Sequence, residues 1–303
     1  MSIETHKNQF SGILSFGFSD NEEIENDGLF VELSDGRKSP KKCYDLLKSQ
    51  IDEMCFRWSN RKADDNQFEN RSIVALQGDS YGVDTLSWNR DEGSKKLVVF
   101  IHGLNGSPTI WNRYLLKLES ESNQATTFAP YVKDKGYCKL KEAALPILEA
   151  VQNYISKYPD NSVTLVGYSN GASIAGYIER KINTKKVTLV SIAGAFNGTM
   201  LIDRINATPG LEKPLGISKD LHHEWMFDND WHRKRVKKWQ AGESAAEVKR
   251  IFFATANDIC VYPFKTSFPY LPNSEYLLLS TGSHLTIIDE VFESVISCVA
   301  DQQ

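Results

Sequence analysis

Short and almost uninterrupted apolar runs recur through the second two thirds of the sequence. Residues 96–101 read Lys-Leu-Val-Val-Phe-Ile, and four comparable runs follow. These runs do not alternate between apolar and polar positions, which is typical of strands that are covered on both faces, as in parallel α/β sheets. We therefore predict buried strands at residues 96–101, 163–166, 187–192, 251–254 and 276–279.

Helical patterns separate these runs. Residues 140–158 and 172–182 have the spacing of helices, and a further helix is expected at 285–299. This alternation after about residue 90 predicts an α/β fold with a mostly parallel central sheet and helices on both of its faces. Residues 200–247 break the rhythm, and we interpret them as an inserted, mostly helical segment.

The first part of the chain has a different pattern. It is polar, with an acidic stretch at residues 20–27, and apolar positions at helical spacing occur only later, between Cys43 and Cys55. Strand-like runs on either side of a glycine-containing turn at 78–82 suggest a hairpin. We therefore divide the chain into an N-terminal extension at residues 1–71, packing on the core, and a domain at residues 72–303 that contains the insertion at about 200–247.

Composition narrows the class of protein without indicating an activity. The chain has 303 residues, of which 41% are hydrophobic and 24% charged, and a formal net charge of −4. This charge gives no general attraction to nucleic-acid phosphates, so no nucleic-acid partner is expected. No apolar run approaches the ~20 residues of a membrane helix, and the first residues lack the pattern of a secretory signal. Five scattered cysteines without a CxxC pair fit reduced thiols, so we expect a cytoplasmic location.

The motif with the clearest chemical meaning is Gly-Tyr-Ser-Asn-Gly at residues 167–171, between a predicted strand and a predicted helix. A serine in such a tight turn needs small residues two positions before and after it, because larger side chains would collide across the turn. The turn exposes the hydroxyl above the sheet, and the helix N-terminus beneath it favours negative charge. We predict that Ser169 is a nucleophile; a purely structural glycine-rich turn is the alternative.

Other strand ends carry groups that complete such a site. Asp258 follows the fourth predicted strand, at the edge where parallel sheets assemble their sites. His284 follows the fifth strand and comes last in the order Ser, Asp, His, which indicates a general base. The loop that begins with His102 and Gly103 follows the first strand, and its N–H groups, together with the N–H of Asn170, are expected to form an oxyanion hole. His102 itself precedes the serine by 67 positions and is expected to order its loop.

With these motifs, the chain resembles the α/β-hydrolase superfamily, in particular its lipase- and esterase-like serine hydrolases. The resemblance covers about residues 72–303 and includes the segment at 191–199, whereas the first ~70 residues do not match. It implies an α/β-hydrolase fold and an acyl-enzyme mechanism that needs no cofactor. The roles it implies are Ser169 as nucleophile, His284 as base, Asp258 as its orienting acid, and Leu104 and Asn170 as backbone oxyanion donors.

A basic and aromatic segment lies within the predicted insertion. Residues 232–238 read His-Arg-Lys-Arg-Val-Lys-Lys, with large aromatic residues on both sides. One interpretation is a solvated helix face whose aromatic side chains pack on the domain. The other is a lid over the site that touches an acyl substrate or makes weak contact with a membrane surface. His222-His223-Glu224 begins like a zinc-binding helix, but Phe227 occupies the place of the second histidine, so no metal is expected.

Three functions stay open at this level. The first is hydrolysis of a small-molecule or lipid ester. The second keeps the triad for amide or peptide hydrolysis, or for acyl transfer to an acceptor other than water. The third is a non-catalytic scaffold that binds ligands; it requires a missing or misplaced triad member, and all three members occur here in order.

Overall fold

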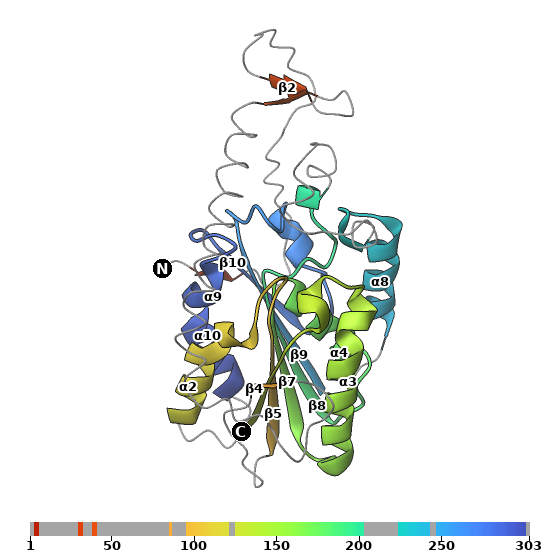
Figure 1. The fold of residues 1–303 in the computed structure, drawn as a ribbon, viewed down its shortest axis with the longest axis vertical. Helices are drawn as coiled ribbons and strands as arrows, with labels where there is room; N and C mark the ends of the chain where they lie inside the picture. Colours follow the sequence, from red (N-terminus) through yellow and green to blue (C-terminus); the bar gives the residue numbers. More distant parts are fainter. Residues whose placement is uncertain are drawn as a thin grey trace.

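A central β-sheet with helices on both faces forms the body of the protein (Figure 1). The computed structural model describes residues 3–5, 30–32, 38–40, 85–86, 95–120, 125–202, 224–242 and 247–300. Eight strands pair in the order β1-β10-β9-β8-β7-β5-β6-β4. The bounds of these strands are β1 Ile3–Thr5, β4 Thr85–Leu86, β5 Lys96–Ile101, β6 Ala125–Pro130, β7 Ser162–Tyr168, β8 Lys186–Ile192, β9 Glu247–Thr255 and β10 Ser274–Leu279.

The strands from β5 to β10 are all parallel, which confirms the predicted sheet; β1 and β4 pair antiparallel at its two edges. All five predicted strands are present. The pattern missed β6, because its sequence Ala-Thr-Thr-Phe-Ala-Pro contains a single large apolar side chain. Since the six strands run in one direction, their carboxyl ends meet at one edge of the sheet, where α/β folds place their sites.

Helices cover both faces of the sheet, as the sequence pattern predicts. In Figure 1, α2, α9 and α10 lie on one face, and α3, α4 and α8 lie on the other. The predicted C-terminal helix is divided into α9 and α10 at Val291, and the helix after Ser169 begins at Asn170, two residues earlier than predicted. Their bounds are α2 Asn112–Ser120, α3 Leu140–Lys157, α4 Asn170–Glu179, α8 Asp230–Ala241, α9 Ile287–Glu290 and α10 Phe292–Ala300.

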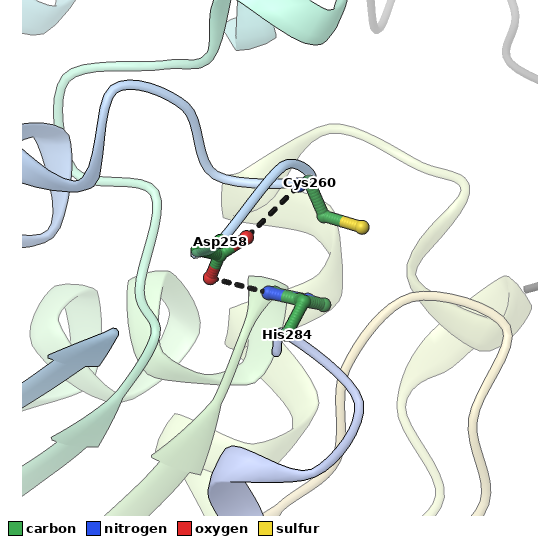
Figure 2. Close-up of side chains that lie close together, drawn as sticks. All are labelled: Asp258, Cys260 and His284. Carbon is green, nitrogen blue, oxygen red and sulfur yellow. Dashed lines mark hydrogen bonds and ion pairs between the residues drawn. The ribbon is translucent and has the colours of Figure 1, made fainter. Parts of the chain in front are cut away.

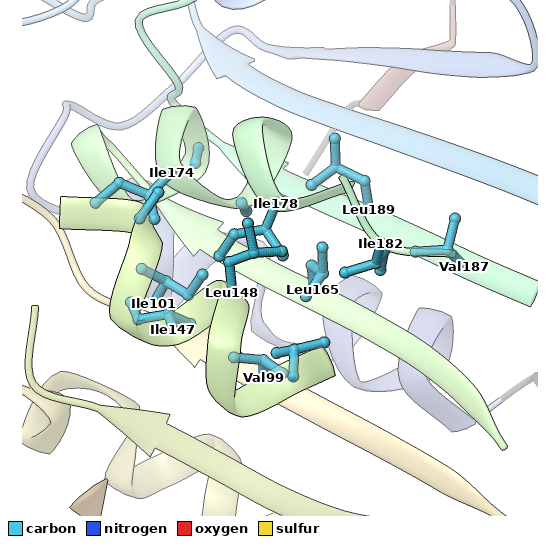
Figure 3. Packing of buried hydrophobic residues seen from close by; sticks show 14 of the residues in the cluster. Val99, Ile101, Ile147, Leu148, Leu165, Ile174, Ile178, Ile182, Val187 and Leu189 are labelled. Atoms are coloured by element: carbon cyan, nitrogen blue, oxygen red, sulfur yellow. The ribbon is translucent and has the colours of Figure 1, made fainter. Parts of the chain in front are cut away.

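The unalternating apolar strands result from two separate hydrophobic layers. In β5, Val99 and Ile101 point to the α3–α4 side, whereas Val98 and Phe100 belong to the layer under α2 and α10. Figure 3 shows the layer on the α3–α4 side, where Val99, Ile101 and Leu165 pack with residues of α3 and α4. Each Å² of apolar surface that is buried contributes about 25 cal/mol to stability. Burial on both faces of the sheet therefore stabilises this three-layer arrangement.

Little of the N-terminal extension falls within the described residues. β1 pairs with β10, so Ile3–Thr5 extends the sheet, and β2 (Phe30–Glu32) and β3 (Lys38–Pro40) form a separate antiparallel pair. The helix predicted between Cys43 and Cys55 lies outside the described residues. So does the hairpin predicted around residues 78–82, except for β4, which pairs with β6.

Truncation of Leu165 tests the packing of the α3–α4 layer. Leu165 lies at the centre of β7 and is fully buried. Leu165→Ala should lower the free energy of unfolding by about 2–5 kcal/mol, because it removes buried methyl groups and leaves a cavity. Leu116→Ala, on the 40% exposed Leu116 of α2, is the control and should change it by less than about 1 kcal/mol. Urea unfolding of both variants measures the difference; equal effects would contradict the assigned layers.

Candidate active site

Ser169 occupies the turn between β7 and α4. Its φ of 56° and ψ of −124° are rare for a residue with a side chain, and such a conformation costs about 1–3 kcal/mol. Two hydrogen bonds hold the turn: the Ser169 N–H donates to the carbonyl of Ile192 (2.8 Å), and the Ala172 N–H donates to the carbonyl of Ser169 (3.0 Å). The turn therefore fixes the serine at the carboxyl edge of the parallel strands.

Lack of space explains both glycines of the motif. A Cβ atom on Gly167 would lie 2.5 Å from Cα of Ala172, and one on Gly171 would lie 2.2 Å from the carbonyl oxygen of Ile101. In both cases the neighbouring atom belongs to the backbone of the sheet or helix, so it cannot yield without displacing the element. The expectation of small residues on both sides of Ser169 is confirmed.

His284 lies between Ser169 and Asp258. Its Nε2 is 3.0 Å from the Ser169 Oγ, and its Nδ1 is 2.8 Å from the Asp258 Oδ2. An ionised carboxylate only accepts hydrogen bonds, so this contact requires the proton on Nδ1 and leaves the lone pair of Nε2 facing the serine hydroxyl. Thus the structure brings together the three predicted side chains from loops that follow β7, β9 and β10.

Both oxygens of the Asp258 carboxylate accept hydrogen bonds, and Figure 2 shows those from His284 and from the backbone of Cys260. While Oδ2 accepts from His284, Oδ1 accepts from the N–H groups of Cys260 (2.9 Å) and Val261 (2.7 Å). The side chains of Asp258 and His284 are buried, so water competes little for these bonds. Three N–H donors therefore hold the carboxylate in the orientation that His284 requires.

Cys260 adds a third group of metal-ligating type beside Asp258 and His284, with the three ligand atoms within 4.8 Å of one another. Burial, with a smaller contribution from the charge of Asp258, raises the pKa of the Cys260 thiol well above its ordinary value. In this structure Asp258 and His284 are hydrogen-bonded to each other, and Oδ1 of Asp258 accepts from the backbone N–H of Cys260.

Two residues that the sequence analysis did not single out position the histidine loop. The hydroxyl of Tyr168 donates to the backbone carbonyl of His284 at 2.6 Å. The hydroxyl of Thr255, at the end of β9, donates to the carbonyls of Thr281 (2.9 Å) and Gly282 (3.1 Å). Tyr168 belongs to the motif around Ser169, so its place was visible in the sequence, but its contact depends on a loop 116 residues away.

The predicted oxyanion donors are backbone groups beside Ser169. Asn170 begins α4, so its N–H has no acceptor within the helix. Leu104 lies in the loop after β5, which packs closely on the serine turn, since a Cβ on Gly103 would lie 3.0 Å from the Ser169 Cβ. The N–H groups of Leu104 and Asn170 therefore belong to adjoining segments. Their role as an oxyanion hole remains a prediction.

A short loop that the sequence analysis did not single out binds both of these segments. It is a 3-10 turn at Lys133–Gly136. Its Lys135 carbonyl accepts from the N–H of Asn105 (2.8 Å), and its Gly136 carbonyl accepts from Nδ2 of Asn170 (3.3 Å). Asn105 has a positive φ of 53°, so this contact also stabilises a strained conformation.

His102 has the structural role that the sequence analysis expected. Its Nδ1 donates to the carbonyl of Gly103 (2.8 Å), and its Nε2 accepts from the N–H of Val132 (3.0 Å). Burial lowers the pKa of His102 to about 4, with a smaller contribution from Lys135. The neutral ring thus connects the loop after β5 to the loop after β6.

The described part of the predicted insertion contains α8. Trp239 of α8 is buried, packs on Phe196, and donates through Nε1 to Glu179 at 2.5 Å. This contact agrees with the interpretation that aromatic side chains of the segment pack on the domain. The rest of the insertion, including His222 and His223, lies outside the described residues, so the lid remains a prediction. Within the described parts of the chain, no helix has the length and apolar character needed to cross a membrane.

Strand order, parallel direction and the strand–turn–helix element around Ser169 define the class: the chain has the α/β-hydrolase fold. A Listeria innocua gene product of known structure is similar in fold, with a TM-score of 0.50 and 13% identity over 68% of this chain and 94% of that one. A structure reported for carboxylesterases of Nitrososphaera gargenis gives a TM-score of 0.48 and 14% identity over 74% and 97%. A lipase-esterase related protein from Clostridium acetobutylicum gives 0.45 and 18% over 71% and 98%. No family model and no curated protein matches the sequence.

Protonation of His102 should destabilise the fold in acid. Its folded pKa of about 4 lies below the ordinary 6.5, so the unfolded state binds more protons between these values. The stabilisation is therefore complete above pH 6.5 and is lost as the pH falls toward 4, by about 3 kcal/mol. His102→Gln cannot titrate and should show a flatter dependence. Urea unfolding between pH 4 and 7.5 tests this, and parallel curves for wild type and variant would exclude the effect.

Proposed function

We propose that the protein is a serine hydrolase that cleaves carboxylic esters, of small molecules or lipids, through an acyl-enzyme. The observation that carries the proposal is the position of His284, with Nε2 at 3.0 Å from Ser169 Oγ and Nδ1 at 2.8 Å from Asp258. This is the arrangement in which an imidazole activates a hydroxyl while a carboxylate fixes its tautomer.

In the proposed acylation, the oxygen of Ser169 attacks the ester carbonyl carbon while His284 Nε2 takes the hydroxyl proton. The tetrahedral intermediate carries its negative charge on the former carbonyl oxygen, which the N–H groups of Leu104 and Asn170 stabilise. The imidazolium, stabilised by Asp258, then gives its proton to the leaving alcohol. Water then attacks the carbonyl carbon of the acyl-enzyme while His284 Nε2 takes its proton. The imidazolium returns a proton to Ser169 Oγ as the bond between that oxygen and the acyl carbon breaks, and the acid is released.

Esters are the proposed substrate class because an alcohol is a better leaving group than an amine and needs less assistance from the general acid. The same side chains support hydrolysis of amides or peptides and acyl transfer to other acceptors, so these reactions are the alternatives. Comparing p-nitrophenyl esters of increasing chain length with matched anilides separates ester from amide cleavage. Added alcohols or amines reveal acyl transfer.

Ser169→Ala should abolish both turnover of p-nitrophenyl esters and labelling by a fluorophosphonate probe, because no other side chain occupies the nucleophile position. The variant should keep its unfolding transition, since within the described residues the hydroxyl forms one hydrogen bond, to His284. Activity and labelling are measured on wild type and variant at equal concentration. A folded wild type that does not react with the probe would favour the non-catalytic scaffold; substantial activity in the variant would refute Ser169.

Asp258→Asn should slow ester hydrolysis by about 10²–10⁴-fold, with a small effect on KM. The amide keeps the shape of the side chain but can present an N–H to His284, which favours the wrong tautomer. Steady-state kinetics of the variant test this. The matched change Asp160→Asn, on an exposed carboxylate that pairs with Lys185 before β7, is a control and should retain near wild-type kcat. Equal rates for wild type and Asp258→Asn would remove Asp258 from the triad.

A further inference from the structure

A groove is lined by residues of α3, α4 and α8 and their ends. Figure 1 shows these three helices on the face of the sheet opposite α2 and α10. This groove has a volume of about 710 Å³, within the usual range of small-molecule sites. None of Ser169, Asp258 and His284 lines it. The groove is therefore distinct from the proposed active site.

Among the residues that the structure describes, seven basic side chains and two carboxylates line this groove. Lys139 and Lys141 come from the start of α3, and Arg180 and Lys181 come from the end of α4. The remaining three are on α8. In a chain whose formal net charge is −4, this local excess of positive charge is unusual.

The α8 side of the groove contributes Lys234, Arg235 and Lys238. Arg233 of the same helix does not line the groove. Its guanidinium group forms ion pairs with Asp228 (3.0 Å) and Asp230 (2.7 Å). Within the described residues, none of the seven basic groups of the groove forms an ion pair. Arg233 is therefore paired outside the groove, whereas Lys234, Arg235 and Lys238 have no ion-pair partner in the described part of the chain.

The two carboxylates do not neutralise the groove. Oε2 of Glu224 accepts a hydrogen bond from the N–H of Leu140 at 2.7 Å and thereby caps the N-terminus of α3. Its charge also lies near Arg235, but no ion pair forms between them in the described part of the chain. Glu142 sits in the first turn of α3, where its charge complements the helix dipole.

Arg180 and Arg235 form the centre of the cluster. They are half-buried and adjacent, since the Arg180 Nη1 donates to the carbonyl of Arg235 at 3.4 Å. Nε of Arg180 is inaccessible to water and has no hydrogen-bond partner among the described residues. Burial, and then the charge of Arg180, lowers the pKa of Arg235 to about 9. Two neighbouring, partly desolvated guanidinium groups repel each other, and an anion bound between them would offset that repulsion.

Aromatic rings keep both guanidinium groups in place. Arg235 lies 4.7 Å from the centre of the Trp231 ring, and Arg180 lies 5.7 Å from Tyr177 and 5.8 Å from Trp239. The Nη2 of Arg235 also donates to the carbonyl of Phe196 at 2.6 Å. The pair is consequently preorganised, which lowers the entropic cost of binding a ligand.

We propose that this groove binds a phosphate ester, with the phosphate group between Arg180 and Arg235 and the lysines of α3 and α8 around it. Phosphate suits this arrangement because guanidinium groups bind its oxygens in a bidentate manner and several cations match its double charge. The ester is either a soluble phosphorylated molecule or a lipid headgroup, since both present the same phosphate.

Pyrophosphate is the probe for the soluble source. Calorimetric titration of the full chain should show one binding site, and the fluorescence of Trp231 and Trp239 should change in parallel. Arg180→Gln should weaken binding at least tenfold, and Lys234→Gln, on an exposed side chain, about threefold. Arg113→Gln removes the same charge from α2 on the opposite face and should leave affinity within twofold.

Phosphatidylcholine vesicles with and without phosphatidic acid test the lipid source by co-sedimentation. Arg180-dependent binding to either probe supports the groove and identifies the source. Binding of neither probe by folded wild type overturns the proposal, as does an equal loss in Arg113→Gln and Arg180→Gln. If Arg180→Gln alters the unfolding transition, the affinity of Lys234→Gln is used in its place. An affinity equal to that of wild type in Lys234→Gln would then refute the site. Fluorophosphonate labelling of Ser169 reports the proposed function separately.

Discussion

The close approach of the first turn of α4 to the end of β5 is the constraint on which the site depends. Gly171 meets the carbonyl of Ile101 so closely that a single Cβ atom would lie 2.2 Å from it. This close approach accompanies the tight turn from β7 into α4, in which Ser169 has a positive φ of 56°. Packing of α4 on the sheet, including Ile174 and Ile178, offsets this strain (Figure 3). Exposure of the serine hydroxyl is thus a consequence of core packing.

The other two side chains must reach the serine from strands that are not its neighbours. Ser169 follows β7, whereas Asp258 and His284 follow β9 and β10, with β8 in between. The histidine loop therefore crosses the carboxyl edge of the sheet, and hydrogen bonds from Tyr168 and Thr255 hold it along that path. A triad built from parallel strands needs such bridging contacts, because the sheet alone separates its members by the width of the intervening strand.

The features of the fold and the site that depend on residues close together in the sequence could be predicted. The unalternating strands and the motif around Ser169 are visible because each depends on residues within a few positions, and the parallel sheet follows from their alternation with helices. Strand β6 was missed because its alanine and threonine residues become buried only through pairing with β5. The contacts of Tyr168 and of the loop at Lys133–Gly136 join segments far apart in the chain, so no pattern within either segment reveals them.

Both proposed sites include residues at an end of α4, and the helix dipole has opposite effects on an anion at the two ends. Its N-terminus, at Asn170, presents free N–H groups that favour a negative charge beside Ser169. Its C-terminus, ~15 Å away by helical rise, carries a partial negative charge that favours the cations Arg180 and Lys181. The helix dipole disfavours an anion at that end, so the cationic side chains of the groove, with Arg180 and Arg235 at their centre, must supply the attraction. Affinity in the groove must therefore come from side chains, while the charge in the proposed active site is stabilised by the backbone.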